Sequence, residues 1–68
     1  QLHIQTDFEN ADEFYTELLD ISGRSLIQQQ GANSVIDTHA ISSGIYFVRI
    51  VHSLSGNSYS RKVVISGN

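Results

Sequence analysis

Hydrophobic and polar side chains alternate along most of the last third of the sequence, from Gly44 to Ser66. Side chains two positions apart lie on the same face of a β-strand, so this alternation is typical of strands with one buried face. The dipeptide Gly56-Asn57 interrupts the pattern and is typical of a tight turn. We therefore predict a β-hairpin. One shared face of its two strands holds Tyr46, Val48, Ile50, Tyr59, Arg61, Val63 and Ile65.

Two loop lengths keep the hydrophobic faces of this hairpin matched. A four-residue loop, Leu54 to Asn57, sets Arg49 opposite Lys62, and like charges directly across an antiparallel pair are unfavourable. A two-residue loop at Gly56-Asn57 avoids this clash, so we predict the shorter loop. Its register pairs Val48 with Ile65, Ile50 with Val63 and Leu54 with Tyr59.

A second hairpin is predicted upstream, around the turn Asp20-Ile21-Ser22-Gly23. Aspartate in such a turn bonds its carboxylate to the backbone, and glycine takes the positive φ that the turn needs. The strand before this turn covers Phe14 to Leu19. The strands of the second hairpin are expected to share a face that holds Phe14, Thr16, Leu18 and Leu26.

The segment from Asn10 to Asp20 also fits a helix. Asn10 is a suitable N-cap and Glu13 its capping-box partner, and hydrophobic residues recur at helical spacing. A helix here gives an α+β domain, whereas a strand gives an all-β antiparallel sandwich of about six to seven strands. The other short strands are expected at 2–6 and 35–37, with a turn at 42–44.

Composition narrows the class of protein. With 68 residues, 40% of them hydrophobic, the chain is expected to form one small domain, 1–68. The absence of cysteine excludes disulfides and cysteine-based sites. Four basic residues against seven acidic ones argue against binding to nucleic acid or an anionic membrane. The longest hydrophobic runs, such as Ile45 to Val51, are too short to span a membrane, so direct membrane insertion is not expected.

No catalytic or metal site is predicted. His3, His39 and His52 are widely separated, and none has a second ligand at metal-binding spacing. The acidic residues between Asp7 and Glu13 lack the ligand pattern of a calcium loop, so we interpret them as a solvated loop. Because no nucleophile elbow or phosphate-binding glycine loop is present, we expect no intrinsic catalysis and no cofactor.

Three short segments follow one another toward the end of the chain: "LLDISGR", "VIDTHAISSGIYFVRI" and "SYSRKVVIS". They contain an Asp-x-x-Gly-Arg turn, a Gly-x-Tyr strand start and a lysine before the last hydrophobic strand. The residues concerned are Asp20, Gly23, Arg24, Gly44, Tyr46 and Lys62. In this order and spacing, the chain resembles the C-terminal sorting domain of cargo proteins of the type IX (Por) secretion system of Gram-negative bacteria. The resemblance covers Leu2 to Ser66.

The resemblance implies an immunoglobulin-like β-sandwich and favours a strand over a helix for Phe14 to Leu19. Gly23 would make the turn, Gly44 would free the backbone at the start of its strand, and Tyr46 would anchor the core. Such domains commonly begin with a proline-containing "NP" segment, whereas this chain has no proline. We therefore expect that the linker and the upstream cargo are absent from this sequence.

The resemblance further implies a non-catalytic signal. An outer-membrane translocon would recognise the folded domain on its way from the periplasm, and a sortase-like peptidase would then remove it. The cargo would be secreted or attached to lipopolysaccharide at the cell surface. The implied recognition surface is the edge of the last strand, which would also allow two copies to associate. Its residues are Arg61, Lys62, Val63, Val64 and Ile65.

A second interpretation keeps the same fold. The domain could be a carbohydrate-binding or adhesion module appended to an extracellular enzyme, with Tyr15 or Phe47 as the sugar-stacking residue. Charged residues on a terminal strand also discourage aggregation of its edge, and this explanation of Arg61 and Lys62 requires no partner.

Overall fold

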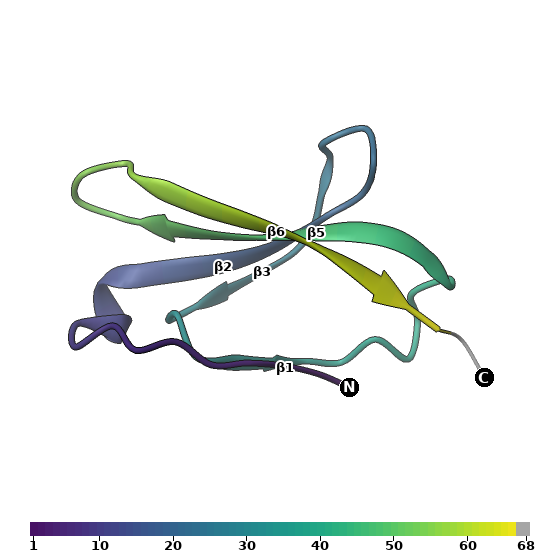
Figure 1. The fold of residues 1–68 in the computed structure, drawn as a ribbon, viewed down its shortest axis with the longest axis horizontal. Coiled ribbons are helices and arrows are strands. Elements are labelled where there is room, and N and C mark those ends of the chain that lie inside the picture. The colour runs from purple at the N-terminus through teal and green to yellow at the C-terminus, as the bar shows by residue number, and fades with distance from the viewer. Residues whose placement is uncertain (67–68) are drawn as a thin grey trace.

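The computed structural model describes residues 1–66 and consists almost entirely of β-strands (Figure 1). The elements in chain order are β1 (Leu2–Ile4), a short 3₁₀ turn η1 (Ala11–Glu13), β2 (Phe14–Leu19), β3 (Ser25–Gln30), β4 (Ser34–Ile36), β5 (Gly44–His52) and β6 (Ser58–Ile65). The predicted all-β fold is confirmed.

The strands form two antiparallel sheets that face each other. The larger sheet has the order β3-β2-β5-β6, and the smaller one consists of β1 and β4. In Figure 1 the smaller sheet runs along the bottom of the molecule, beneath the larger one. Hydrophobic side chains from both sheets meet between them. The buried residues of this core are Leu18, Ile36, Val48 and Ile65.

The register of the β5–β6 hairpin differs from the predicted one. Val48 lies opposite Arg61 rather than Ile65, which pairs with Gly44. Because the shift is an even number of positions, every side chain remains on its predicted face. In this register Lys62 lies opposite Phe47, so the like-charge pair of the alternative four-residue loop, Leu54 to Asn57, does not form.

The loop between β5 and β6 explains the register. Its four residues are Ser53 to Gly56, and the N–H of His52 closes it by donating to the C=O of Asn57 at 2.8 Å. Within the loop the Ser55 hydroxyl lies 2.8 Å from Nδ1 of His52. Gly56 has a φ of 78°, a conformation that glycine adopts without strain. The predicted two-residue turn is wrong because these local hydrogen bonds favour an earlier turn.

A strand, not a helix, follows Asn10. The N–H of Glu13 donates to the C=O of Asn10 at 2.9 Å, and the Asn10 amide donates to the Glu13 carboxylate at 3.0 Å. These bonds make a single 3₁₀ turn, and β2 begins directly afterwards at Phe14. Strand β2 lies between β3 and β5, and Phe14 and the four residues from 16 to 19 are buried. Sheet pairing on both edges therefore overrides the helical pattern.

A β-bulge shifts the partner of β2. Leu18 lies opposite Ile27, whereas Leu19 lies opposite Ser25, so Leu26 is the extra residue between the two pairs. The expectation that Leu26 shares the core face with Leu18 is therefore wrong. Ile27 packs against the core instead.

One of the two short strands is shorter than predicted, and the other begins and ends one residue earlier than predicted. β1 ends at Ile4, and β4 ends at Ile36, which lies opposite Leu2. Thr6 lies beyond β1, where its N–H and its hydroxyl bond the Asn33 side-chain oxygen at 2.6 and 3.1 Å. This contact holds the segment after β1 beside the segment before β4.

Candidate functional site

The predicted Asp20 turn forms as a closed hydrogen-bonded loop. One carboxylate oxygen of Asp20 accepts bonds from the backbone N–H groups of Ser22 and Arg24 at 3.0 and 2.9 Å. The Ser22 hydroxyl donates to the same oxygen at 2.6 Å. Gly23 has a φ of 90°, as the sequence predicted. The bonds from Ser22 and Arg24 hold the pKa of Asp20 below its ordinary value of 3.8.

A second polar cluster joins the β5–β6 loop to the start of β2. Nε2 of His52 lies 3.0 Å from the carboxylate of Glu13, and the His52 ring tilts against Phe14 at a centroid distance of 4.8 Å. Hydrogen bonds from His52 and then from Asn10 lower the pKa of Glu13 below its ordinary value of 4.5. The pairing of His52 with Glu13 was not predicted, because the two residues are far apart in sequence.

Acidification should weaken the folded state through these two carboxylates. The pKa values of Asp20 and Glu13 are lower in the folded chain, so the unfolded chain binds protons first as the pH falls. Their stabilisation is present above their ordinary pKa values of 3.8 and 4.5 and is lost as the pH falls through the lowered values. Urea unfolding at several pH values measures this, and the pH dependence should be shallower in the variant Asp20→Asn/Glu13→Gln. An equally steep dependence in that variant would contradict this assignment.

Tyr46 and Gly44 lie at the start of β5. The Tyr46 ring is half-buried against the core, and its hydroxyl donates to the C=O of Ser42 at 2.7 Å. Tyr46 lies opposite Val63 in β6. A Cβ atom at Gly44 would meet the Tyr46 ring at 3.7 Å, which is an ordinary contact. The geometry thus gives Tyr46 a structural role at the point where β5 leaves its preceding turn.

Strand β6 is the outer strand of the larger sheet and pairs only with β5 among the described residues. Lys62 and Val64 lie on its outer face, and Val64 is 70% exposed. Arg61, Val63 and Ile65 lie on the opposite face, where Ile65 is buried in the core. Each residue of the predicted edge is therefore on the face that the alternation assigned to it.

The motif residues gather at one end of the larger sheet. Gly44 pairs with Ile65 and Tyr46 with Val63, so the start of β5 lies beside the end of β6. Leu19, the last residue of β2, pairs with Phe47, which places the Asp20 turn at this same end. Arg61 and Lys62 lie further along, nearer the middle of β6. The motif residues were named from the sequence, and the strand order places the Asp20 turn at the same sheet end as Gly44 and Tyr46.

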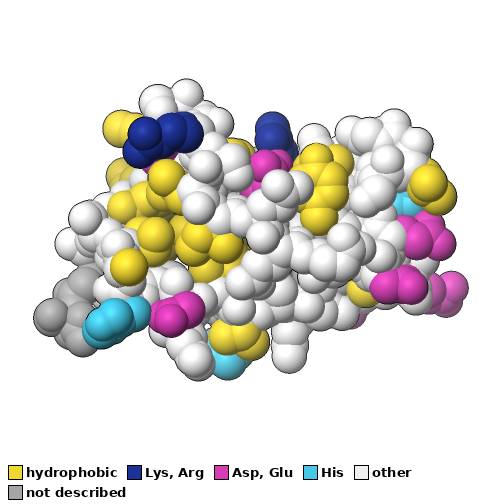
Figure 2. Space-filling model, turned by 180° about the vertical axis from the view of Figure 1, so that it is seen from behind, with side chains coloured by type: hydrophobic (Ala, Val, Ile, Leu, Met, Phe, Trp, Pro, Cys, Tyr) yellow, Lys and Arg dark blue, Asp and Glu magenta, His cyan; other side chains and the backbone are white. Residues whose placement is uncertain are grey.

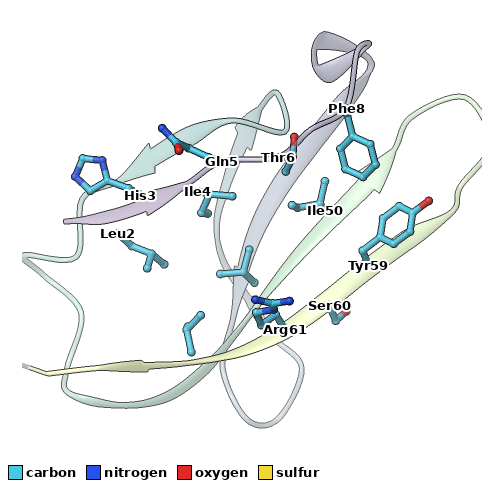
Figure 3. A pocket seen from close by; sticks show the side chains of 12 residues that line it. Leu2, His3, Ile4, Gln5, Thr6, Phe8, Ile50, Tyr59, Ser60 and Arg61 are labelled. Carbon is cyan, nitrogen blue, oxygen red and sulfur yellow. The ribbon is translucent and has the colours of Figure 1, made fainter.

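A groove that was not predicted lies between β1 and the inner face of β6. It is a cavity of about 450 Å³, with hydrophobic side chains from β1, β5 and β6 on its walls. Figure 3 shows Leu2 and Ile4 projecting into it from β1, with Phe8 and Tyr59 toward one end. The rings of Phe8 and Tyr59 lie 5.5 Å apart. The alternation in each strand was visible in the sequence, but the meeting of the first and last strands is a tertiary feature.

The outer face of the larger sheet carries a partly buried ion pair, Glu17–Arg49. Nη2 and Nε of Arg49 lie 2.6 and 3.0 Å from one oxygen of Glu17, whose side chain is only 9% exposed. Glu17 lies directly opposite Arg49 across β2 and β5. This pair was also missed, because the register that creates it cannot be read from either strand alone.

Charge is unevenly distributed over the surface. Figure 2 shows hydrophobic side chains gathered over one half of the face opposite to that of Figure 1, with basic groups above and acidic groups at the far end.

Within residues 1–66, no three histidine or carboxylate side chains lie close enough to hold a metal ion. In the same range no helix is long and hydrophobic enough to cross a membrane.

Comparison with known proteins identifies the family. The model of the family described as the secretion system C-terminal sorting domain matches residues 1–66, and the resemblance seen in the sequence is thereby confirmed. No significant match was found among curated proteins or among solved structures. The chain belongs to the family of secretion system C-terminal sorting domains, and it is a sorting signal that interacts with the type IX secretion machinery and directs export to the cell surface or the extracellular space.

Proposed function

We propose that residues 1–68 form one non-catalytic sorting domain, which the outer-membrane translocon recognises in the folded state as the cargo arrives from the periplasm. A sortase-like peptidase then removes the domain, and the cargo is released or attached to the cell surface. The observation that carries this proposal is the family match across residues 1–66. No cofactor takes part, because the signal acts by its shape and surface alone.

The edge of β6 is the surface that we assign to recognition. It combines an unpaired strand edge with two basic residues, Arg61 and Lys62, and with the exposed Val64. Such edges accept a partner strand through backbone hydrogen bonds. Val63 and Ile65 contribute from the inner face, where they join β6 to the core. The same edge allows two copies to pair when the translocon is absent.

The Asp20 turn supports the edge of β6 rather than forming a separate site. Asp20, Gly23 and Arg24 close the end of the sheet at which Gly44 and Tyr46 meet the end of β6. The Arg24 side chain is 76% exposed and lies beside Asp20, with Nε 3.5 Å from its carboxylate. In this proposal the turn fixes the sheet end, and Arg24 remains accessible to the translocon.

Export of a passive carrier tests the proposal. We expect a carrier fused to residues 1–68 to be exported by a competent host, and deletion of residues 62–68 to abolish export because it removes half of the β6 edge. A fusion with Leu54→Ser is the control, because Leu54 is 82% exposed in the β5–β6 loop, far from the motif end. Secreted carrier is measured by immunoblot of washed cells and medium. Normal export of the truncated fusion would refute the proposed function.

Carbohydrate binding receives no comparable support. Tyr15 and Phe47 are both on the outer face, but Tyr15 lies opposite Val51 and Phe47 opposite Leu19, toward the two ends of β2. The two rings therefore do not form one continuous aromatic surface, and any sugar stacking would rest on one of them alone. This alternative stays a prediction, and a glycan array with Tyr15→Ala and Phe47→Ala variants tests it.

A further inference from the structure

The groove between β1 and β6 is bordered by two strand edges that have no partner within residues 1–66. β1 pairs only with β4, and β6 pairs only with β5. Between the two edges the walls are mainly hydrophobic, with Ile4 on one side and Ile50 and Val63 on the other. Figure 3 shows this hollow open between the two strands. A free edge beside a hydrophobic hollow is the arrangement that accepts an additional strand.

Within residues 1–66, Arg61 is the one lysine, arginine, aspartate or glutamate whose side chain lines the groove, which His3 also lines. It lies on the inner face of β6, opposite Val48, and no aspartate or glutamate is among the lining residues. The ion pairs found within residues 1–66 involve Arg24, Arg49 and His52, but not Arg61. A guanidinium group in a hydrophobic groove without a carboxylate can pair with a carboxylate supplied by another molecule, and such a pair is stronger there than in open solvent.

The backbone of β6 presents N–H groups at its free edge that an additional strand can bond. The hydrogen bond from His52 N–H to Asn57 C=O at 2.8 Å places this pair in the hydrogen-bonded class of an antiparallel ladder. The two classes alternate along the hairpin, so every second N–H of β6 points toward β5 and the others point to the free edge. The N–H groups directed to the free edge are those of Ser58, Ser60, Lys62 and Val64.

We propose that the groove takes one extended segment of the export machinery, which adds to the free edge of β6, places hydrophobic side chains at alternate positions into the hollow, and bears a carboxylate for Arg61. This inference rests on the proposed function and specifies the chemistry of the partner. The positive charge of Arg61 is the reason for expecting an acidic residue in the bound segment. A hydrophobic strand without an acidic residue would bury the Arg61 guanidinium unpaired, which is costly.

Export of the carrier fusion by charge variants tests this inference. Arg61→Gln removes the cation from an exposed side chain and should leave the fold intact, as circular dichroism and the urea midpoint will verify. We expect export to fall by about tenfold or more, because a charge-assisted bond is lost. Arg61→Lys keeps the positive charge but lacks the bidentate geometry of arginine. Export of this fusion should therefore lie between that of the unchanged fusion and that of Arg61→Gln. Leu54→Glu is the matched control, since it also makes the net charge more negative by one, at a position that is 82% exposed in the β5–β6 loop and outside the groove.

The outcomes separate this inference from the proposed function. Loss of export in Arg61→Gln with normal export in Leu54→Glu supports the proposed binding of a segment in the groove. If Arg61→Gln is exported normally while deletion of residues 62–68 abolishes export, the groove does not bind the proposed segment, and the sorting function is unaffected. Equal losses in Arg61→Gln and Leu54→Glu would show a net-charge effect and also overturn the groove inference. Normal export of the truncated fusion overturns both. If purified Arg61→Gln forms dimers yet is exported normally, Arg61 protects the edge and does not bind a partner.

Discussion

Replacing Leu18 with alanine is expected to remove about 2 to 5 kcal/mol from the free energy of unfolding. The Leu18 side chain is fully buried, and it belongs to the core that joins the two sheets. A domain of this length has a total stability of roughly 3 to 10 kcal/mol, so one such cavity removes a large share of it. Urea unfolding followed by tyrosine fluorescence or circular dichroism measures the change.

The exposed residue Val64 provides the control for this substitution. Val64→Ala truncates a side chain that is 70% exposed, and its effect should stay within about 0.5 kcal/mol. Similar losses in Leu18→Ala and Val64→Ala would mean that no core forms between the sheets. Because the translocon is proposed to recognise the folded domain, a Leu18→Ala fusion should also be exported poorly at temperatures where it is unfolded.

Breaking the Glu17–Arg49 pair is the second large effect that we expect. Arg49→Met leaves the buried Glu17 carboxylate without its cation, and we expect a loss of about 2 kcal/mol. This is below the cost for a fully buried pair because the Arg49 side chain is 40% exposed. The double variant Glu17→Leu/Arg49→Met should recover part of the loss, since no unpaired charge is left behind. A double-mutant cycle in urea gives the coupling between the two residues.

Arg24 is the matched comparison for this ion pair. Its partner Asp20 lies 3.5 Å away, and the Arg24 side chain is 76% exposed. Exposed pairs contribute about 0 to 1 kcal/mol, so Arg24→Met should cost much less than Arg49→Met. If the two variants were equally destabilised, the burial of Glu17 would not be the reason for the cost.

The strands were predictable because alternation reports directly on burial. The faces of β5 and β6 follow from side chains two positions apart, and all remain on their predicted faces in the structure. The register was not predictable by the same reasoning, since shifts by an even number of positions preserve the faces. The hydrogen bonds of Ser55 and the φ of Gly56 fix it locally, and these features depend on a loop conformation that composition does not specify.

The candidate site shows the same division between local and tertiary information. The Asp20 turn was predictable because all its hydrogen bonds lie within Asp20 to Arg24. The β2–β3 bulge was not, because the hydrophobic pattern leaves both Leu26 and Ile27 available for the core face. The groove with Arg61 depends on the first strand of the chain lying beside the last one. Nothing in either segment specifies that neighbour.

The central claim is that β6 is an ordered strand with one paired and one free edge. Amide hydrogen exchange of residues 1–68, followed by NMR, tests it most directly. The account predicts alternating protection, because only every second N–H of β6 bonds to β5. We expect slow exchange at Tyr59, Arg61, Val63 and Ile65, and fast exchange at Ser58, Ser60, Lys62 and Val64. Uniformly rapid exchange from Ser58 onward would contradict the account, since a strand without order presents no edge to recognise.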